Sequence, residues 1–268
     1  MITQQSLKRI ASQKKLPAGV VEKSYVIAWL LKEIYQNETL KEALVFKGGT
    51  ALNVVYFPET WRLSHDLDFT RVKDVDAEEL RRGFADVFSS LVANSGIRVV
   101  FDSYHVTEGS IVARVQFIGP LDFKNSLKLD VTFDEKLLHE PVWMRVSSVY
   151  PDLVSFDVNV YPLNEILIEK IRSIIQRGRS RDYYDVWRLL KVKDVEMGAV
   201  ERQLIEKCQI NDVPYRPDLI FNYDRLKEAG SYWEKSLNVL TKELPKFEDV
   251  ISELKGRLSF SFKNGESI

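Results

Sequence analysis

Three aspartates lie in two segments that alternate like β-strands. Asp66 and Asp68 are separated by one residue in "LSHDLDF", and Asp130 lies in "SLKLDVTF". Side chains two apart on a strand share a face, so Asp66 and Asp68 point one way while Leu67 and Phe69 point the other. If the two strands are neighbours in a sheet, three carboxylates converge on one side of it. Asp134 has the same parity as Asp130 and is the alternative third carboxylate.

Carboxylates gathered in this way require a cation, because like charges repel and burial adds a desolvation cost. Mg²⁺ (or Mn²⁺) takes oxygen ligands, often one or two carboxylates together with substrate phosphates. This chemistry suits metal-assisted phosphoryl or nucleotidyl transfer. A competing interpretation is that Asp66 and Asp68 only decorate a solvated strand face.

A glycine turn precedes the aspartate pair in "FKGGTAL". Gly48 and Gly49 permit positive φ and close backbone approach, so successive N–H groups can face an anion, and Thr50 adds a hydroxyl. A plain tight turn is the alternative. The Lys-Ser or Lys-Thr of a phosphate-binding P-loop is absent, which excludes that class of site.

The elements that position these residues follow from periodicity. Helical spacing covers residues 22–35 and 77–93, and a short helix after Thr50 ends at Pro58. The run "ALVF" before Lys47 indicates a buried strand or the end of a helix–strand connection. Three strand-like pieces, "IRVVFDSY", "SIVARVQFIG" and "SLKLDVTF", have short links that favour antiparallel pairing. The chain is helical after Pro162. The sequence therefore predicts an α+β fold, with a mixed sheet in residues 1–160 and helices in residues 161–268.

The composition is that of an ordinary globular protein. The net charge is −1, so any site for a polyanion must be a local patch. Cys208 is the only cysteine, which excludes an internal disulfide and a multi-cysteine zinc site. The N-terminus lacks the apolar segment of a signal peptide, and no apolar run is long enough to cross a bilayer. We expect a soluble, cytoplasmic protein that does not associate with membranes.

Taken together, "EKSYVIAWLL", "FKGGTAL" and "RLSHDLDF" resemble the AbiEii-type nucleotidyltransferases, toxins of type IV toxin–antitoxin and abortive-infection systems. That family belongs to the DNA polymerase β-like nucleotidyltransferase superfamily, whose pattern is Gly-Gly-[Ser/Thr], then Asp-x-Asp, then a later strand aspartate. The resemblance runs from about Glu22 to Leu190. It implies a polymerase β-like core with N-terminal helices and a helical C-terminal domain contributing to the active-site cleft. Fifteen residues separate Thr50 from Asp66, more than in the compact superfamily pattern but ordinary for this branch.

A second family pattern is matched in "NEILIEKIRSIIQRGRSRDYYDVWRLL". Lys170 matches the family lysine, and Asp182 and Asp185 match its final acidic pair. On a helical wheel Lys170 lies at the edge of an apolar stripe, which also fits a surface lysine whose stem packs against it. Asp182 is either a helix cap or a partner for a cation. Asp185 is expected to pair with Lys170 or Arg181.

The resemblance also implies residue roles. The implied catalytic residues are Asp66, Asp68, Asp130, Lys170 and Asp182, of which the first three hold the metal. The implied nucleotide-binding residues are Gly48, Gly49, Thr50, Arg62, Ser64, Lys170 and Asp185. A positive rim for triphosphate or RNA could add Arg62, Arg177, Arg179 and Arg181, although each also fits a solvated surface arginine.

The implied reaction moves NMP from an NTP to an acceptor, with a tRNA 3′ end favoured and an antitoxin encoded nearby. A protein hydroxyl, as in AMPylation, is the alternative acceptor. An inactive nucleotide-binding module is a second alternative, against which the three strand carboxylates count. A metal-dependent nuclease is a third, but a nuclease has no triphosphate for the glycine turn to hold.

Overall fold

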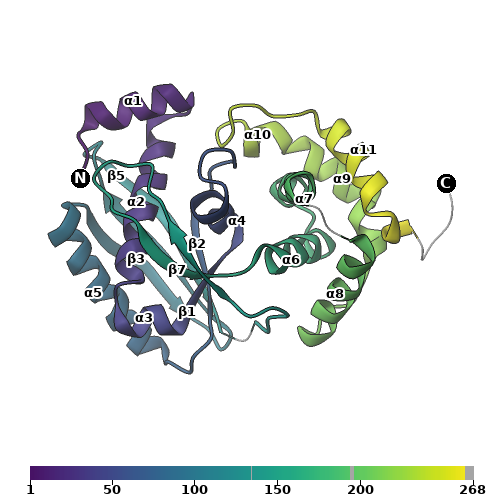
Figure 1. The fold of residues 1–268 in the computed structure, drawn as a ribbon, viewed down its shortest axis with the longest axis horizontal. Helices are drawn as coiled ribbons and strands as arrows, with labels where there is room; N and C mark the ends of the chain where they lie inside the picture. Colours follow the sequence, from purple (N-terminus) through teal and green to yellow (C-terminus); the bar gives the residue numbers. More distant parts are fainter. Residues whose placement is uncertain (134, 194–195, 263–268) are drawn as a thin grey trace. The chain divides into compact units, whose positions relative to one another are not determined.

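The computed structural model describes residues 1–133, 135–193 and 196–262. The chain forms two compact units. We call residues 1–135 with 141–161 the sheet unit, and residues 136–140 with 162–268 the helical unit. Figure 1 shows the strands together in the first unit and a set of helices in the second. The α+β fold predicted from the sequence is confirmed by this arrangement.

A seven-stranded mixed sheet forms the centre of the sheet unit, with strand order β3-β4-β5-β2-β1-β7-β6. The parallel pairs are β2 with β5 and β1 with β7, and the other neighbours are antiparallel. The strands are β1 (Leu44–Lys47), β2 (Asp66–Arg71), β3 (Arg98–Val106), β4 (Ser110–Ile118), β5 (Lys124–Thr132), β6 (Val142–Val146) and β7 (Phe156–Val160). The predicted antiparallel run of three strands is β3-β4-β5. The strands β6 and β7 were not predicted.

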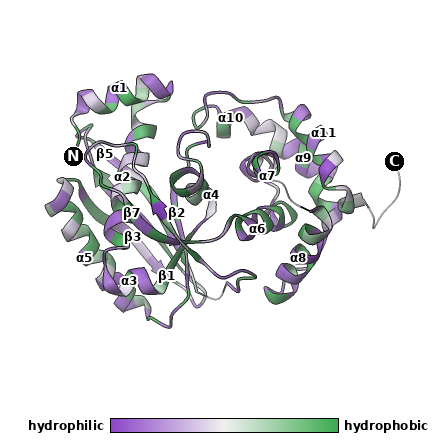
Figure 2. Cartoon of the chain, in the orientation of Figure 1, coloured by the Kyte–Doolittle hydropathy of each residue, from purple (hydrophilic) through white to green (hydrophobic). Residues whose placement is uncertain are grey.

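Helices of the sheet unit pack against the strands, and capping residues define the ends of α5. They are α1 (Gln4–Lys14), α2 (Ala18–Ile34), α3 (Glu38–Ala43), α4 (Gly48–Ala51) and α5 (Ala77–Ser95). In α5 the Asp76 side chain caps the start by accepting from the Glu79 amide at 2.8 Å, and Gly96 ends the helix in the left-handed region at φ 77°. Its predicted apolar stripe, from Leu80 to Leu91, is buried. The helices carry hydrophobic and hydrophilic stripes along their lengths (Figure 2).

The short helix predicted after Thr50 changes its winding. Residues Gly48–Ala51 are α-helical, and Leu52–Tyr56 continue as a π-helix in which the Phe57 amide donates to the Leu52 carbonyl at 2.8 Å. The helix ends before Pro58, as the sequence predicts. A π-turn is uncommon and is often found beside functional residues, and this one directly follows the glycine turn.

The helical unit is built around α6 (Leu163–Gln176) and α7 (Ser180–Val192). The stripe predicted on α6 is buried, and Val186, Leu189 and Leu190 of α7 are buried as well. The remaining helices are α8 (Met197–Ile210), α9 (Tyr223–Ser231), α10 (Trp233–Leu237), α11 (Phe247–Arg257) and the 3₁₀ turns Pro217–Phe221 and Ser259–Phe262. None of the described helices of the chain has the length and apolar character required to cross a membrane.

Candidate active site

One face of the central strands is polar and carries the predicted carboxylates. Asp66 and Asp68 lie on the same face of β2, while Leu67 on the opposite face is fully buried. In the parallel pair of β2 with β5, Asp68 lies directly opposite Asp130 and Asp66 lies opposite Lys128. Neighbouring strands are about 4.8 Å apart, so Asp68 and Asp130 are within reach of one small cation. We call this side of β1, β2, β5 and β4 the polar face.

The glycine turn lies against the second of these aspartates. Gly48 follows β1 with φ 79°, and a β carbon on it would be 2.7 Å from Oδ2 of Asp68. A β carbon on Gly49 would be 3.0 Å from Nη2 of Arg62 and 3.2 Å from Oγ of Ser64. The backbone of the turn therefore lies next to the Asp68 carboxylate at Gly48, and next to the Arg62 guanidinium and the Ser64 hydroxyl at Gly49. A β carbon at Gly48 would force the Asp68 carboxylate to move, and one at Gly49 would require a smaller shift of Arg62 and Ser64.

Thr50 anchors the turn to the aspartate strand. Its buried hydroxyl donates to the backbone carbonyl of Asp66 at 2.5 Å. From the sequence, this hydroxyl was expected to face the phosphates. In the structure its hydrogen goes to β2 and fixes the distance between the glycine turn and the Asp66 backbone.

Arg62 and Ser64 lie in the connection between the turn and β2. Both are buried, with 2% and 6% of their surfaces exposed. Arg62 donates from Nη1 to its neighbour's carbonyl at Leu63, at 3.2 Å, while Nη2 lies near Gly49. A buried guanidinium beside a glycine turn supplies the positive charge that a triphosphate requires, whereas the solvated alternative left open for Arg62 does not fit its burial.

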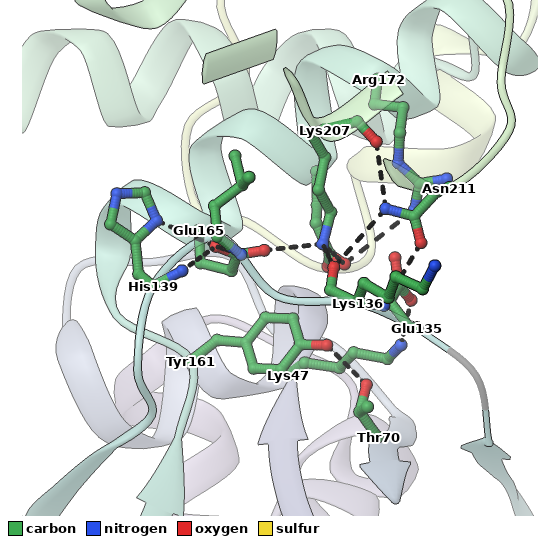
Figure 3. Close-up of polar contacts among 12 residues, drawn as sticks. Lys47, Thr70, Glu135, Lys136, His139, Tyr161, Glu165, Arg172, Lys207 and Asn211 are labelled. Atoms are coloured by element: carbon green, nitrogen blue, oxygen red, sulfur yellow. Dashed lines mark hydrogen bonds and ion pairs between the residues drawn. The ribbon is translucent and has the colours of Figure 1, made fainter. Parts of the chain in front are cut away.

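Lys47 is a charged residue of the polar face that sequence reasoning missed. It is the antiparallel register partner of Asp68, and its Nζ lies 2.7 Å from Oε2 of Glu135 and 3.3 Å from Oγ1 of Thr132. The Tyr161 ring lies 5.7 Å from Nζ, and Figure 3 shows Lys47 and Tyr161 side by side. The available signal was its position directly before the glycine turn in "FKGGT".

The donor set on the polar face fits a divalent cation shared with a substrate. Oδ2 of Asp130 is paired with Nζ of Lys128, whereas no described residue forms a hydrogen bond to its other, buried oxygen, Oδ1. Within the described parts of the chain, no three His, Cys, Asp or Glu side chains form a ready metal-binding group. Mg²⁺ is commonly held by one or two carboxylates and completed by substrate phosphates, and a carboxylate oxygen that accepts no hydrogen bond is suited to that mode.

Two further residues lie near these aspartates in the sequence. His65, which immediately precedes Asp66, has its Nε2 3.2 Å from the carbonyl oxygen of Val20 at the start of α2. It therefore serves as a packing link between α2 and β2. Asp134, the alternative to Asp130, lies outside the described residues.

In the helical unit, Lys170 of α6 is paired with both aspartates of α7. Its Nζ lies 2.9 Å from Oδ2 of Asp185 and 3.4 Å from Oδ1 of Asp182. The two carboxylates are almost fully buried, and the Lys170 side chain is 11% exposed. Lys170 is thus no solvated surface lysine. Of the two partners expected for Asp185, the structure pairs it with Lys170.

The capping alternative for Asp182 is not realised. The helix begins after Arg179, and Asp182 lies within its first turn. Its carboxylate accepts from Nε of Arg177 at 3.0 Å and from Nη2 at 3.2 Å, which is a two-point ion pair. Gly178 lies at φ 58° between the two helices, and this left-handed residue allows Arg177 to turn back onto α7. Of the predicted arginine rim in this unit, Arg177 is therefore bound to a carboxylate.

A glycine turn, an Asp-x-Asp strand and a third aspartate on the neighbouring strand form the arrangement typical of nucleotidyltransferases. A family model described as "Nucleotidyl transferase AbiEii toxin, Type IV TA system" matches residues 29–253. The chain belongs to this family of nucleotidyltransferase toxins.

Structure comparison gives the same fold. The chain is similar to the nucleotidyltransferase toxin MenT4 of Mycobacterium tuberculosis H37Rv, with a TM-score of 0.72 and 17% sequence identity. The match covers 99% of this chain and 91% of that chain. A search of curated proteins finds no match.

Proposed function

We propose that the protein transfers a nucleoside monophosphate from an NTP to the 3′ end of a tRNA in a Mg²⁺-dependent reaction, with Mn²⁺ as a substitute ion. The observation that supports this most directly is the pairing of Asp68 with Asp130 on adjacent strands, beside a glycine turn that a β carbon would block. Oδ1 of Asp130, which accepts no hydrogen bond from the described residues, suits a metal that is completed by triphosphate oxygens.

In this proposal Asp66, Asp68 and Asp130 hold the metal ions. When bound, such ions neutralise phosphate charge and orient the attacking and leaving oxygens. The backbone of Gly48 and Gly49 approaches the triphosphate, which side chains at these positions would exclude. Thr50 keeps that turn against β2 through its bond to the Asp66 carbonyl.

The remaining groups act on charge and on the proton. Arg62, with Ser64 beside it, faces the triphosphate side of the turn, and Lys47 lies across from Asp68. The acceptor hydroxyl oxygen forms a bond to the α-phosphorus, and the bond from that phosphorus to the bridging oxygen breaks to release pyrophosphate. Asp130 accepts the hydroxyl proton, since its Oδ1 has the capacity to accept one.

The family resemblance assigns Lys170 and Asp182 to the reaction and Asp185 to nucleotide binding, and we propose the same roles here. Two buried carboxylates hold the Lys170 ammonium in one position. A lysine that is fixed in this way is suited to neutralise phosphate charge without paying for its own ordering. Lys170→Met should then abolish transfer, and Asp185→Asn should weaken NTP binding by displacing Lys170.

The decisive experiment incubates the protein with Mg²⁺, total tRNA and each α-labelled triphosphate in turn. Wild type is compared with Asp66→Ala/Asp68→Ala, whose fold is checked by circular dichroism. Label on tRNA from wild type alone supports the proposal and identifies the nucleotide. Full activity in the double variant would refute it.

The other outcomes separate the competing functions. Label on protein instead of tRNA would establish a protein-modifying transferase. Triphosphate binding without pyrophosphate release would indicate an inactive binding module, and RNA cleavage without label would indicate a nuclease. Membership of a toxin family further leads us to propose a cognate antitoxin encoded next to this chain.

A further inference from the structure

Two cations face each other on the polar face, next to the aspartate pair. Arg114 of β4 and Lys128 of β5 are direct partners in the antiparallel register, and Lys128 is in turn opposite Asp66. Like charges directly opposite one another destabilise a sheet. The side chains of Arg114 and Lys128 are 63% and 52% exposed. Their position opposite each other is therefore not imposed by packing in the core. A negatively charged ligand above these strands would remove the repulsion.

The two side chains are anchored at one side only. Arg114 donates from Nε to Oγ of Ser126 at 3.1 Å, and the same nitrogen lies 3.5 Å from Oδ2 of Asp102. Within the described residues, its two Nη groups form no hydrogen bond. Lys128 is paired with Asp130, the carboxylate that accepts the proton of the acceptor hydroxyl in the proposed reaction. The free end of the Arg114 guanidinium has the planar geometry that binds phosphate through two hydrogen bonds.

Lys23 of α2 adds a third cation to this region. Burial lowers the pKa of Lys23, attraction to Asp66 opposes that change, and repulsion from Arg114 adds to it. Lys23 is therefore within electrostatic range of both residues. We call Lys23, Arg114 and Lys128 the basic cluster. The chain as a whole carries a net charge of −1, and this cluster gathers three cations beside the aspartates of the polar face.

The strand order places Arg114 and Lys128 of the basic cluster on the side of β2 away from the glycine turn. The glycine turn follows β1, on one side of the aspartate strand β2, whereas β5 and β4 lie on its other side. If the triphosphate occupies the glycine side, the acceptor must approach Asp130 from the side of β5 and β4. We propose that the basic cluster binds the phosphate backbone of the RNA acceptor, next to the nucleotide whose hydroxyl reacts. This inference rests on the proposed function and adds to it the binding path of the acceptor.

A nucleic acid fits the cluster better than a protein acceptor does. Consecutive phosphates of a single strand supply a row of negative charges, and each contact to Lys or Arg releases a counterion. Arg114 and Lys128 lie directly opposite each other on adjacent strands, whose backbones are about 4.8 Å apart, so their long side chains can reach neighbouring phosphates of one strand. A protein hydroxyl carries no charge for these groups to recognise.

The test compares Arg114→Gln and Arg114→Gln/Lys128→Gln with wild type. Arg145→Gln is the matched control, because Arg145 is an equally exposed strand arginine, paired with Asp157 at 3.0 Å on β6 and β7. The affinity for a fluorescein-labelled single-stranded RNA with a free 3′ hydroxyl is measured by anisotropy at increasing KCl concentrations. The KM for total tRNA in the labelling reaction and the Kd for the triphosphate are measured in parallel.

We expect RNA binding by the double variant to weaken about 10-fold, with the slope of log Kd against log salt reduced by about 1.4 for two lost contacts to a single strand. In the single variant the slope should be reduced by about half as much. This variant leaves the carboxylates of the site and their pair with Lys128 intact. Triphosphate binding should not change. Thermal unfolding should change little, because the loss of two exposed ion pairs, with Asp102 and Asp130, is offset by removal of the like-charge repulsion.

Unchanged RNA affinity and KM in both variants would overturn the inference while leaving the proposed function in place, provided that wild type labels tRNA. An equal loss in Arg145→Gln would also overturn it, because the effect would then be one of general surface charge. If wild type labels protein and not RNA, the proposed function fails, and the acceptor path assigned here fails with it.

Discussion

Gly48 and Asp68 lie so close together that no side chain fits between them. A β carbon at Gly48 would be 2.7 Å from Oδ2 of Asp68, and the glycine has φ 79°. The 2.7 Å contact disfavours a larger residue because its β carbon would press on the Asp68 carboxylate. The positive φ disfavours it because a residue with a β carbon is strained in that conformation. Two independent requirements for glycine therefore coincide at the position where backbone meets the aspartate pair.

Gly48→Ala should therefore impair both stability and catalysis. The left-handed conformation costs a residue with a β carbon about 1–2 kcal/mol, and the contact additionally displaces the Asp68 carboxylate. We expect pyrophosphate release to fall at least about 10-fold, because a small displacement of a metal-binding carboxylate misaligns the reacting atoms. Gly96→Ala separates the two effects: Gly96 has φ 77°, but nothing lies within 4 Å of its added β carbon. Equal loss of activity in both variants would show that strain alone is responsible.

Asp130→Asn should abolish transfer while leaving the fold intact. The substitution keeps the size of the side chain but removes the charge opposite Asp68 and the capacity of Oδ1 to take up a proton. Loss of the partly exposed pair with Lys128 should change the free energy of unfolding by less than about 1 kcal/mol. We expect pyrophosphate release to fall at least about 100-fold, in the range for loss of a general base.

The control for this variant is Asp157→Asn, which breaks an exposed strand ion pair with Arg145 outside the polar face. Urea unfolding and pyrophosphate release are measured for both variants. Near-normal turnover by Asp130→Asn would exclude Asp130 from the reaction.

Local patterns in the sequence were sufficient to predict the components of the site. Strict alternation predicted that Asp66 and Asp68 share a face, and it placed Asp130 on the polar side of its own strand. The wheel of α6 likewise predicted that Lys170 lies at the edge of a buried stripe. Such patterns are readable because each depends on the period of a single element.

Features that depend on pairing between distant segments were not predictable. The sequence allowed β2 and β5 to be neighbours but did not give the register that sets Asp68 opposite Asp130. The position of Lys47 opposite Asp68 was not predicted, because it depends on the register between β1 and β2. Of the two interpretations of Asp182, a helix cap or a partner for a cation, the structure shows the second, because Arg177 reaches its carboxylate through the turn at Gly178.

A buried ion pair stabilises the helical unit independently of the site. Lys207 of α8 and Glu165 of α6 are completely buried, with Nζ and Oε1 2.6 Å apart. Nζ also donates to the Lys136 carbonyl at 2.6 Å, and Oε2 of Glu165 accepts from the Leu138 and His139 amides at 3.1 Å (Figure 3). The pair thus fastens residues 136–140 to the helices of this unit.

Lys207→Met should lower the free energy of unfolding by about 3–5 kcal/mol, because the Glu165 carboxylate stays buried after losing this cation. Glu165→Leu/Lys207→Met should recover only part of the loss, since the two amides then lack their acceptor. Lys191→Met is the control: its pair with Glu253 is exposed and should contribute less than about 1 kcal/mol. Urea unfolding followed by tryptophan fluorescence measures all three. A Lys207 variant as stable as the control would contradict this assignment.

Glu22 gives the sheet unit a pH-dependent stability. The side chain is fully buried, and Oε1 accepts from the Leu121 amide at 2.8 Å, which joins α2 to the turn after β4. Burial raises the pKa of Glu22, an effect only partly opposed by hydrogen bonds from Leu121 and Asn125. Between the unfolded and folded pKa values the folded protein binds more protons than the unfolded chain. Stability therefore falls as pH rises through that interval.

Glu22→Gln should remove this dependence, because the amide has nearly the same shape and does not ionise. Below the unfolded pKa the variant and wild type should be equally stable, whereas above the folded pKa the variant should be the more stable protein. Urea unfolding at a series of pH values from 4 to 8 measures the difference, with the exposed Glu108→Gln as a control for a surface charge change. A difference that stays constant across the series would show that folding does not shift the pKa of Glu22, and would contradict this assignment.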